Sequence, residues 1–266
     1  MGCFKVSIVI SVYNGEQTLD RCFQSIQKQI FQDFEIVCIN DGSTDKSSEI
    51  INKWRDILGE DRFKLSDNNT CIGLTKSLNK GLWLASGYYI ARIDADDFWY
   101  IDKLEKQVNF LEKNKDYGII GCNYINIFKN NTAAKEVRMH ETDEEIKKKI
   151  FHRNPFAHSC IMARKEIIEK AGNYDENVIC GQDYDLWLRC LPLTKFYNLQ
   201  EFLCKRLVSD GISVQKQNTQ MMQCIKTIIK YIKKYRYPWT NYFYILEPLI
   251  IILLPKFIKD LKRKNI

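Results

Sequence analysis

The chain has 266 residues, of which 45% are apolar and 27% are charged, and its formal net charge is +7 at pH 7. This composition is typical of globular proteins and excludes wholesale disorder and fibrous architectures. The length fits one large α/β domain or two small ones, with a core that needs no disulfide bonds. The ten cysteines include no CxxC pair, so we expect the reduced thiols of a cytosolic protein rather than a zinc ribbon or a redox motif.

Strand and helix patterns alternate through the first 97 residues. Continuous apolar runs rich in β-branched residues, with one shorter run among them, predict strands at 7–12, 35–39, 63–66 and 88–93. Helical spacing of the apolar residues predicts helices at 16–29, from the turn at 40–45 to about Leu58, and at 73–85. Repeated β-α-β units of this kind predict a parallel sheet that is wound right-handedly.

The alternation loosens after Asp97. Further helices are expected at 104–111, 144–151 and 183–190. Extended segments are expected at 117–128 and 158–164, with a turn at 129–132.

The C-terminal residues 214–266 differ in charge from the rest of the chain. They hold eleven Lys and Arg against two acidic residues, a net charge of +9, whereas the first 213 residues carry a net charge of −2. We expect a basic helix at 216–236, then an apolar run at 242–254 that a Glu-Pro pair interrupts and that is too short for a clean bilayer span. Such a segment suits an anionic membrane surface, and the alternative is a helical cap that closes the core. The nearly neutral body does not indicate nucleic-acid binding.

Polar residues follow three predicted strands at their carboxyl ends, where wound parallel sheets bind ligands. Tyr13 follows the first strand, Asp41 the second, and the run Asp94–Asp97 the fourth. The three carboxylates of this run repel one another unless a cation neutralises them. Mg²⁺ or Mn²⁺ together with a phosphate ligand fits them, and the alternative is a solvated Asp-rich turn.

Three common nucleotide and hydrolase motifs are absent from the sequence. The turn after the first strand has no GxGxxG, which disfavours a dinucleotide-binding dehydrogenase. No GxxxxGK[ST] loop and no GxSxG elbow occur either, which disfavours P-loop enzymes and α/β-hydrolases.

Five segments in order resemble the family 2 glycosyltransferases with the GT-A fold, and the resemblance covers about residues 4–213. The segments are VSIVISVYN at 6–14, INDGSTD at 39–45, GLTKSLNKG at 73–81, YIARIDADD at 89–97 and QDYDLWLR at 182–189. The resemblance implies an α/β fold with a GT-A-type wound, mainly parallel sheet flanked by helices, to which this chain adds the basic helical extension. It also implies a nucleotide-sugar-binding half at 1–97 and an acceptor-binding, catalytic-base half at 98–213.

The activity that the resemblance implies is transfer of a sugar from a nucleotide-sugar, usually a UDP-sugar, to an acceptor hydroxyl with inversion. Similar family members build surface polysaccharide on lipid-linked acceptors at the cytoplasmic face of the membrane, which would make this enzyme a peripheral membrane protein. Two other functions remain open from the residues alone. One is a nucleotidyltransferase, which also needs a metal held by Asp, and the other is a catalytically degenerate protein that binds membranes or nucleic acid.

Residue roles carry over at the matching positions. Tyr13 and Asp41 are expected to contact the nucleobase, Asp94 to lie near the ribose or sugar, Asp96 to hold the divalent metal on the diphosphate, and Asp183 to act as the catalytic base. A first-turn or capping acid of a helix is the alternative for Asp183.

Supporting roles are expected for Asp97 beside the metal, for His158, for Asp185 as the rival base and for Arg189 in an ion pair. His158 could equally be a packed structural residue. Two positions depart from the family pattern: Gln182 stands where relatives usually carry Glu, and Val208 stands where many carry a His, which puts a third protein ligand to the metal in doubt.

Overall fold

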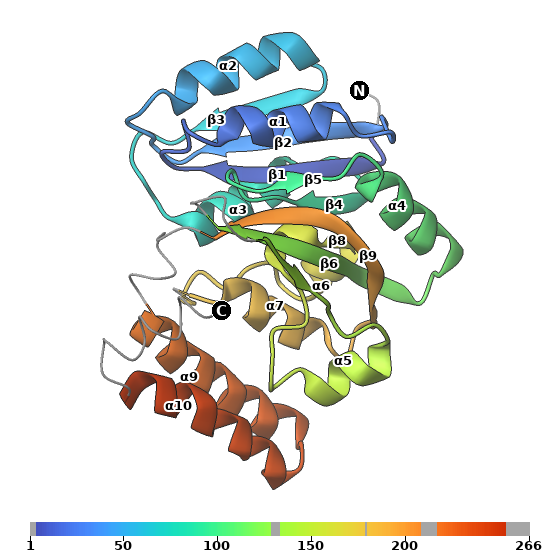
Figure 1. Cartoon of the computed structure of the whole chain (residues 1–266), viewed down its shortest axis with the longest axis vertical. Helices are drawn as coiled ribbons and strands as arrows, with labels where there is room; N and C mark the ends of the chain where they lie inside the picture. Colours follow the sequence, from blue (N-terminus) through green and yellow to red (C-terminus); the bar gives the residue numbers. More distant parts are fainter. Residues whose placement is uncertain (1–3, 129–133, 179, 209–216, 254–266) are drawn as a thin grey trace.

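The computed structural model describes residues 4–128, 134–178, 180–208 and 217–253. The turn expected at 129–132 lies outside these ranges. The first half confirms the predicted parallel sheet, in the strand order β3-β2-β1-β4 (Figure 1). Its strands are β1 (Val6–Val12), β2 (Phe34–Asn40), β3 (Phe63–Asp67) and β4 (Tyr89–Arg92), and its helices are α1 (Leu19–Gln27), α2 (Ser47–Leu58) and α3 (Leu74–Leu84).

The second half continues the same sheet with mixed strand directions, in the order β4-β8-β6-β9-β5, and β7 pairs with β6. Strand β8 runs antiparallel to both β4 and β6, whereas β6 and β9 are parallel. The added elements are β5 (Phe98–Trp99), α4 (Lys103–Lys113), β6 (Tyr117–Phe128), β7 (Ala134–Val137), α5 (Asp143–Lys149), η1 (His158–Cys160), β8 (Met162–Arg164), α6 (Lys165–Lys170), α7 (Gln182–Cys190) and β9 (Lys195–Val208). The strand expected at 158–164 is therefore a 3₁₀ turn followed by a three-residue strand.

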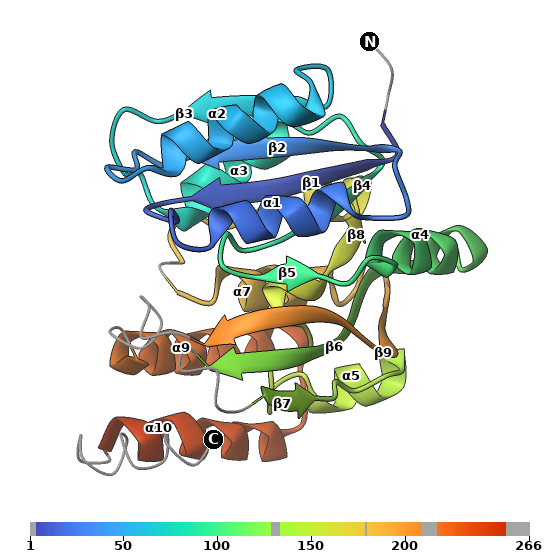
Figure 2. The ribbon, with the colours of Figure 1, turned by 45° about the horizontal axis from the view of Figure 1, so that its top comes forward.

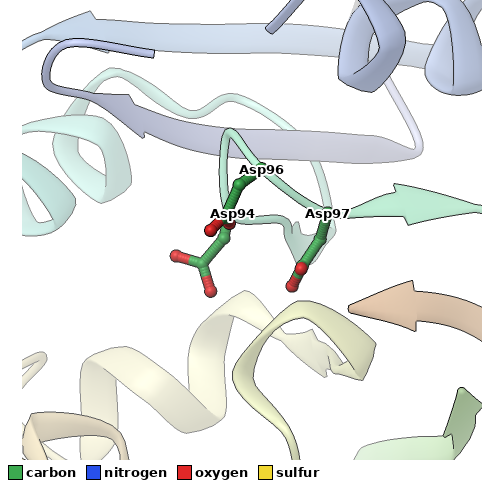
Figure 3. Close-up of side chains that lie close together, drawn as sticks. All are labelled: Asp94, Asp96 and Asp97. Atoms are coloured by element: carbon green, nitrogen blue, oxygen red, sulfur yellow. The ribbon is translucent and has the colours of Figure 1, made fainter. Parts of the chain in front are cut away.

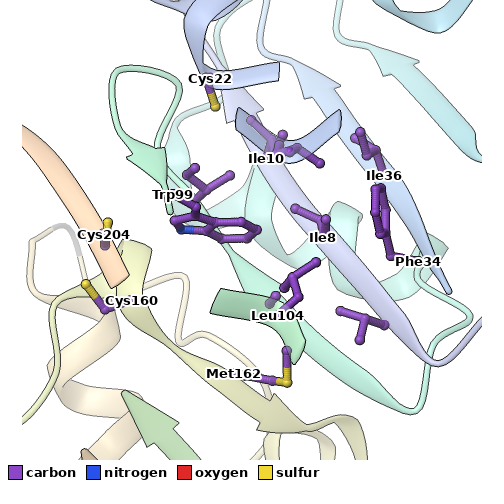
Figure 4. Packing of buried hydrophobic residues seen from close by; sticks show 14 of the residues in the cluster. Ile8, Ile10, Cys22, Phe34, Ile36, Trp99, Leu104, Cys160, Met162 and Cys204 are labelled. Carbon is purple, nitrogen blue, oxygen red and sulfur yellow. The ribbon is translucent and has the colours of Figure 1, made fainter. Parts of the chain in front are cut away.

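Helices cover both faces of the first half because alternate residues of its strands point to opposite sides. Ile8 and Ile10 of β1 pack in one cluster with buried residues of α1 and α2. Val9 packs in the other cluster with buried residues of α3. Figure 4 shows that the first cluster extends past β1 to Trp99 and Met162, so one core joins the two halves of the sheet.

The strand register brings together the residues expected to bind the nucleotide-sugar, at the carboxyl ends of the parallel strands. Val12 pairs with Asn40 at the ends of β1 and β2, so Tyr13 and Asp41 follow side by side. Strand β4 lies next to β1 on the other side and leads directly into the Asp94–Asp97 run.

The described part of the C-terminal extension, residues 217–253, lies at the opposite end of the molecule from β3 (Figure 2). It comprises α9 (Gln217–Tyr235), η2 (Trp239–Ile245) and α10 (Leu246–Leu253). Ile228, Tyr231 and Ile232 of α9 are buried in the same cluster as residues of α7, so α9 closes the core as the cap alternative expects. No helix among the described residues is long and apolar enough to cross a membrane.

Candidate active site

Three carboxylates gather in the loop between β4 and β5 (Figure 3). One oxygen each from Asp94, Asp96 and Asp97 can be chosen so that all lie within 4.8 Å of one another. Because Asp97 is buried and the other two are half-buried, solvent screens their repulsion poorly. The structure thus brings together the three acids that the sequence singled out.

Two of these carboxylates already have partners within the protein. Asp94 forms an ion pair with the buried Arg92 and accepts a hydrogen bond of 3.1 Å from the Ser159 hydroxyl. Asp97 accepts a hydrogen bond of 2.9 Å from the backbone N–H of Leu207. Its other oxygen, Oδ2, lies 3.6 Å from Nε of Arg206 and is buried without a hydrogen-bond partner among the described residues.

Asp96 differs from its neighbours because no described side chain forms an ion pair with it. Burial, and then the charge of Asp94, raise the pKa of Asp96. Burial and Asp94 likewise raise the pKa of Asp97, to about 7. Burial would also raise the pKa of Asp94, but the Arg92 guanidinium outweighs it and holds that pKa well below the usual range.

These residues fit a divalent cation. Asp96 offers a carboxylate that forms no ion pair with the described side chains, and Oδ2 of Asp97, close to it in the cluster, is a buried oxygen without a hydrogen bond from them. Hard oxygen ligands of this kind suit Mg²⁺ or Mn²⁺. Val208 ends β9 directly after Leu207, so position 208 lies beside the cluster, and the Val side chain has no ligand atom to offer.

Asp183 lies in the first turn of α7 and lines a cavity of about 200 Å³. Asn154 donates a hydrogen bond of 2.8 Å to its Oδ2. Burial raises the pKa of Asp183, and the Asn154 hydrogen bond opposes this effect. The helix cap is Gly181, so Asp183 is a first-turn acid that faces a cavity rather than the cap itself. The other lining residues are Tyr124, Met139, Arg153, Asn154, Phe156, Ala157, His158 and Arg206.

His158 joins this cavity to the carboxylate cluster, since it lines the cavity and its neighbour Ser159 binds Asp94. Its Nε2 lies 2.8 Å from the Tyr174 hydroxyl, and burial followed by the charge of Arg92 lowers its pKa. His158 is therefore neutral and packed, while still facing the cavity. Arg206 makes the second connection, because it lines the cavity and approaches Asp97.

Asp185 and Arg189 lie on another side of α7. The Asp185 carboxylate is buried and binds Arg189 Nε at 2.8 Å and the Tyr231 hydroxyl at 2.9 Å. Residues two apart on a helix do not share a face, which explains why Asp185 faces α9 while Asp183 faces the cavity. Gln182 is buried beside Asp183 and brings no charge to it.

The two expected nucleobase residues have different surroundings. Tyr13 is 48% exposed at the end of β1, whereas Asp41 is buried. The Asp41 carboxylate accepts hydrogen bonds of 2.9 Å from the backbone N–H groups of Ile72 and Gly73 and from the Asn68 side chain. Asp41 therefore shapes the loop before α3, and its contact with a nucleobase stays a prediction.

Gly42 shows how closely that loop approaches the end of β2. Its φ is +71°, and a Cβ atom at this position would lie 2.6 Å from the backbone carbon of Thr70. Only glycine tolerates both the conformation and the contact.

Four further residues surround the candidate site without having been predicted from the sequence: Arg92, Asn154, Ser159 and Arg206. Arg206 lies two positions before Val208, the position that the family pattern marked, and this is the signal that could have found it. Arg92 lies in the 89–97 segment that also contains the three acids, although that segment gave it no role. Asn154 and Ser159 lie outside the five segments, and the fold brings them to Asp183 and Asp94.

Comparison with known proteins decides the family. The profile of glycosyl transferase family 2 matches residues 7–172, more than half of the chain. An uncharacterized glycosyltransferase of Methanocaldococcus jannaschii is 32% identical over 265 residues, which cover 95% of this chain and 90% of that protein. The chain belongs to glycosyl transferase family 2.

Two further relatives of this family 2 chain carry names that point to polysaccharide synthesis. The amylovoran biosynthesis glycosyltransferase AmsE of Erwinia amylovora is 30% identical, covering 79% of each chain. The Escherichia coli UDP-Glc:alpha-D-GlcNAc-diphosphoundecaprenol beta-1,3-glucosyltransferase WfaP is 37% identical over 110 residues, 41% of this chain and 42% of that one.

Solved structures of glycosyltransferases confirm the GT-A fold. S. aureus TarS 1–349 in complex with UDP-GlcNAc superposes with a TM-score of 0.69 at 19% identity, covering 85% of this chain and 66% of that one. The mannosyltransferase PcManGT of Pyrobaculum calidifontis, in complex with GDP-Man and Mn²⁺, gives a TM-score of 0.68 at 16% identity over 95% and 70% of the two chains.

Proposed function

We propose that this glycosyltransferase moves a sugar from a UDP-sugar to an acceptor hydroxyl with inversion of the anomeric centre. The observation that carries the proposal is the cavity at Asp183, which His158 and Arg206 connect to the carboxylate cluster. An inverting transfer needs these two features: stabilisation of the leaving diphosphate on one side of the sugar and a proton acceptor on the other.

Each residue of the candidate active site has a different role in the proposed reaction. Asp96 and Oδ2 of Asp97 would hold a divalent cation, which supplies positive charge for the leaving diphosphate. Arg92 neutralises Asp94, so the cluster does not repel the diphosphate with its full negative charge. Asp183 takes the proton from the acceptor hydroxyl as that oxygen attacks the anomeric carbon. Asn154 holds the Asp183 carboxylate in place.

A screen of nucleotide-sugars for release of free nucleotide tests the proposed function. We expect the purified protein to release UDP from one UDP-sugar in the presence of Mn²⁺ or Mg²⁺. Release of pyrophosphate from a nucleoside triphosphate would instead support a nucleotidyltransferase. Absence of turnover with every nucleotide-sugar, together with salt-sensitive binding of RNA, would support a degenerate binding protein.

The acceptor that we propose is a glycan or a lipid-linked sugar in polysaccharide synthesis, at the cytoplasmic face of a membrane. The names of AmsE and WfaP support this class, and WfaP is named for a diphosphoundecaprenol acceptor. The surface of η2 and α10 supports it independently. This exposed apolar surface includes Trp239, Phe243, Leu246, Leu249, Ile250 and Leu253.

We therefore propose that the C-terminal extension 214–266 attaches the enzyme to an anionic membrane. The apolar surface would enter the headgroup boundary, and the basic residues of the extension would add about 1 kcal/mol each where they lie near the lipid surface. Because α9 buries Ile228 and Tyr231 in the core, truncation would damage the fold, and substitutions at exposed residues give a cleaner test.

The double substitution Trp239→Ser with Phe243→Ser is expected to abolish co-sedimentation with vesicles of phosphatidylglycerol and phosphatidylcholine. Binding of the unaltered protein should fall as salt rises, because salt screens the attraction of the basic residues to the lipid. Trp83→Ser is the matched control, since Trp83 is 82% exposed on α3. Unaltered protein that stays in the supernatant would show that the extension is a structural cap alone.

A further inference from the structure

Asp185 of α7 has more side-chain partners than Asp183 on the same helix, although the proposed reaction does not use it. It is 1% exposed and binds three side chains. Arg189 on its own helix lies 2.8 Å from one oxygen, while the Tyr231 hydroxyl at 2.9 Å and Lys230 Nζ at 3.3 Å approach the other. Tyr231 and Lys230 both belong to α9, so a buried carboxylate two residues from Asp183 is tied to the C-terminal extension.

The extension also contacts the segment that holds Asp183 from the other side. Tyr237 packs edge-on against Phe151, with ring centroids 4.8 Å apart, and Tyr244 contacts His152 at 5.3 Å. This segment continues to Asn154, which donates the hydrogen bond to Asp183. The extension therefore touches both elements that determine where the Asp183 carboxylate lies.

We infer that Asp185 is a positioning residue, which ties α7 to α9 and thereby holds Asp183 against Asn154. The inference rests on the proposed function, in which Asp183 is the base. A buried carboxylate is costly unless its oxygens have partners. Arg189 pairs with one oxygen of Asp185, and the partners of the other oxygen, Tyr231 and Lys230, both come from α9. The extension that we propose to meet the membrane is thus also part of the support of the catalytic base.

Loss of the contact between Asp185 and α9 is expected to change the pKa of Asp183. Asn154 donates to the ionised form of Asp183 and so favours it. If α7 shifts and this hydrogen bond weakens, the pKa of Asp183 rises further above its ordinary value. The other charged or titratable groups around it, among the described residues, are Arg92 and Asp94 from the β4 end, Tyr174, and His158, Arg153, Arg206 and Tyr124 around the cavity.

Two variants weaken the contact between Asp185 on α7 and its partners on α9 to different degrees. Asp185→Asn removes the buried charge, and Tyr231→Phe removes only the hydroxyl that binds it. We expect Tyr231→Phe to raise the pKa of Asp183 by at least about half a unit, a threefold change in proton affinity, and to lower kcat about threefold. Asp185→Asn is expected to lower kcat about tenfold, but the loss of its negative charge itself lowers the pKa of Asp183, so the pKa is compared in Tyr231→Phe. The affinity for UDP should stay unchanged in both variants. The pKa is followed by NMR titration of carbon-13-labelled Asp carboxyls, with Asp183→Asn used to assign the resonance.

Tyr235→Phe is the matched control, because it removes the same hydroxyl from α9. The Tyr235 hydroxyl donates to the backbone oxygen of Leu188 at 3.1 Å, near the end of α7 that is far from Asp183. We expect this variant to keep the wild-type pKa of Asp183. An equal effect of all three substitutions would mean general loosening of α9 and would overturn the inference, as would a wild-type pKa in Tyr231→Phe.

The NMR titration separates the inference from the proposed function. Absence of turnover in the unaltered protein would contradict the proposed function. A shifted Asp183 resonance in Tyr231→Phe would still establish the link between α9 and α7. If Asp185→Asn does not fold, Tyr231→Phe alone decides the outcome.

Discussion

Replacing Asp183 by Asn is expected to lower glycosyl transfer by about 10²-fold or more, which is the usual contribution of a general base. The Asn side chain has nearly the same size, so the cavity and the contact with Asn154 change little, but no oxygen remains that can accept the proton. Donor binding should stay nearly intact because the nucleotide is expected at the ends of β1 and β2. The measurements are kcat from released nucleotide and the affinity for UDP by calorimetry.

The pH dependence of the transfer rate tests the role of Asp183 in a second way. Burial raises the pKa of Asp183, and only the ionised carboxylate accepts a proton. The rate should therefore fall on the acid side as the pH drops through this pKa, at a higher pH than the value of about 3.9 for an ordinary Asp would set. Glu166→Gln on the exposed face of α6 is a suitable control, since its carboxylate pairs with Lys170 at the surface. Wild-type turnover in Asp183→Asn would move the role to another carboxylate.

The first half of the fold was predictable because three of its four strands, β1, β2 and β4, are buried on both faces. Strand β2 is buried at every position, and such strands leave continuous apolar runs in the sequence. Strand β9 was missed because it is irregularly buried and carries charged residues such as Glu201 and Lys205. Strand β5 has two residues and β7 is almost wholly exposed, so neither leaves a hydrophobic pattern.

The candidate site was predictable only in part, for a related reason. Asp94, Asp96 and Asp97 are adjacent in the sequence, so their repulsion could be inferred without a structure. Ser159 and Arg206 reach this cluster through the strand order β4-β8-β6-β9, which no local pattern encodes. Asp185 shows the limit most clearly: the sequence left it as a rival base, whereas the structure pairs it with α9.

Replacing Asp96 by Asn is expected to weaken nucleotide binding and its dependence on a divalent cation together. Arg92 already neutralises Asp94, and the Leu207 N–H together with Arg206 partly satisfies Asp97. Asp96 is the carboxylate with the least support from the protein, so the substitution removes most of the charge available to a cation. Losing a group that only supports a metal ligand typically costs 10- to 100-fold in affinity, and we expect at least about tenfold here.

Calorimetric titration of UDP with and without Mn²⁺ measures both effects in one experiment. Glu49→Gln is the matched control, because it removes an exposed carboxylate from α2 and should leave Mn²⁺-dependent binding unchanged. Asp94→Asn should behave differently from Asp96→Asn, since it frees the buried Arg92 guanidinium and adds positive charge beside the diphosphate. If Asp96→Asn binds UDP with the Mn²⁺ dependence of the unaltered protein, the cation is held elsewhere and the assignment of Asp96 is wrong.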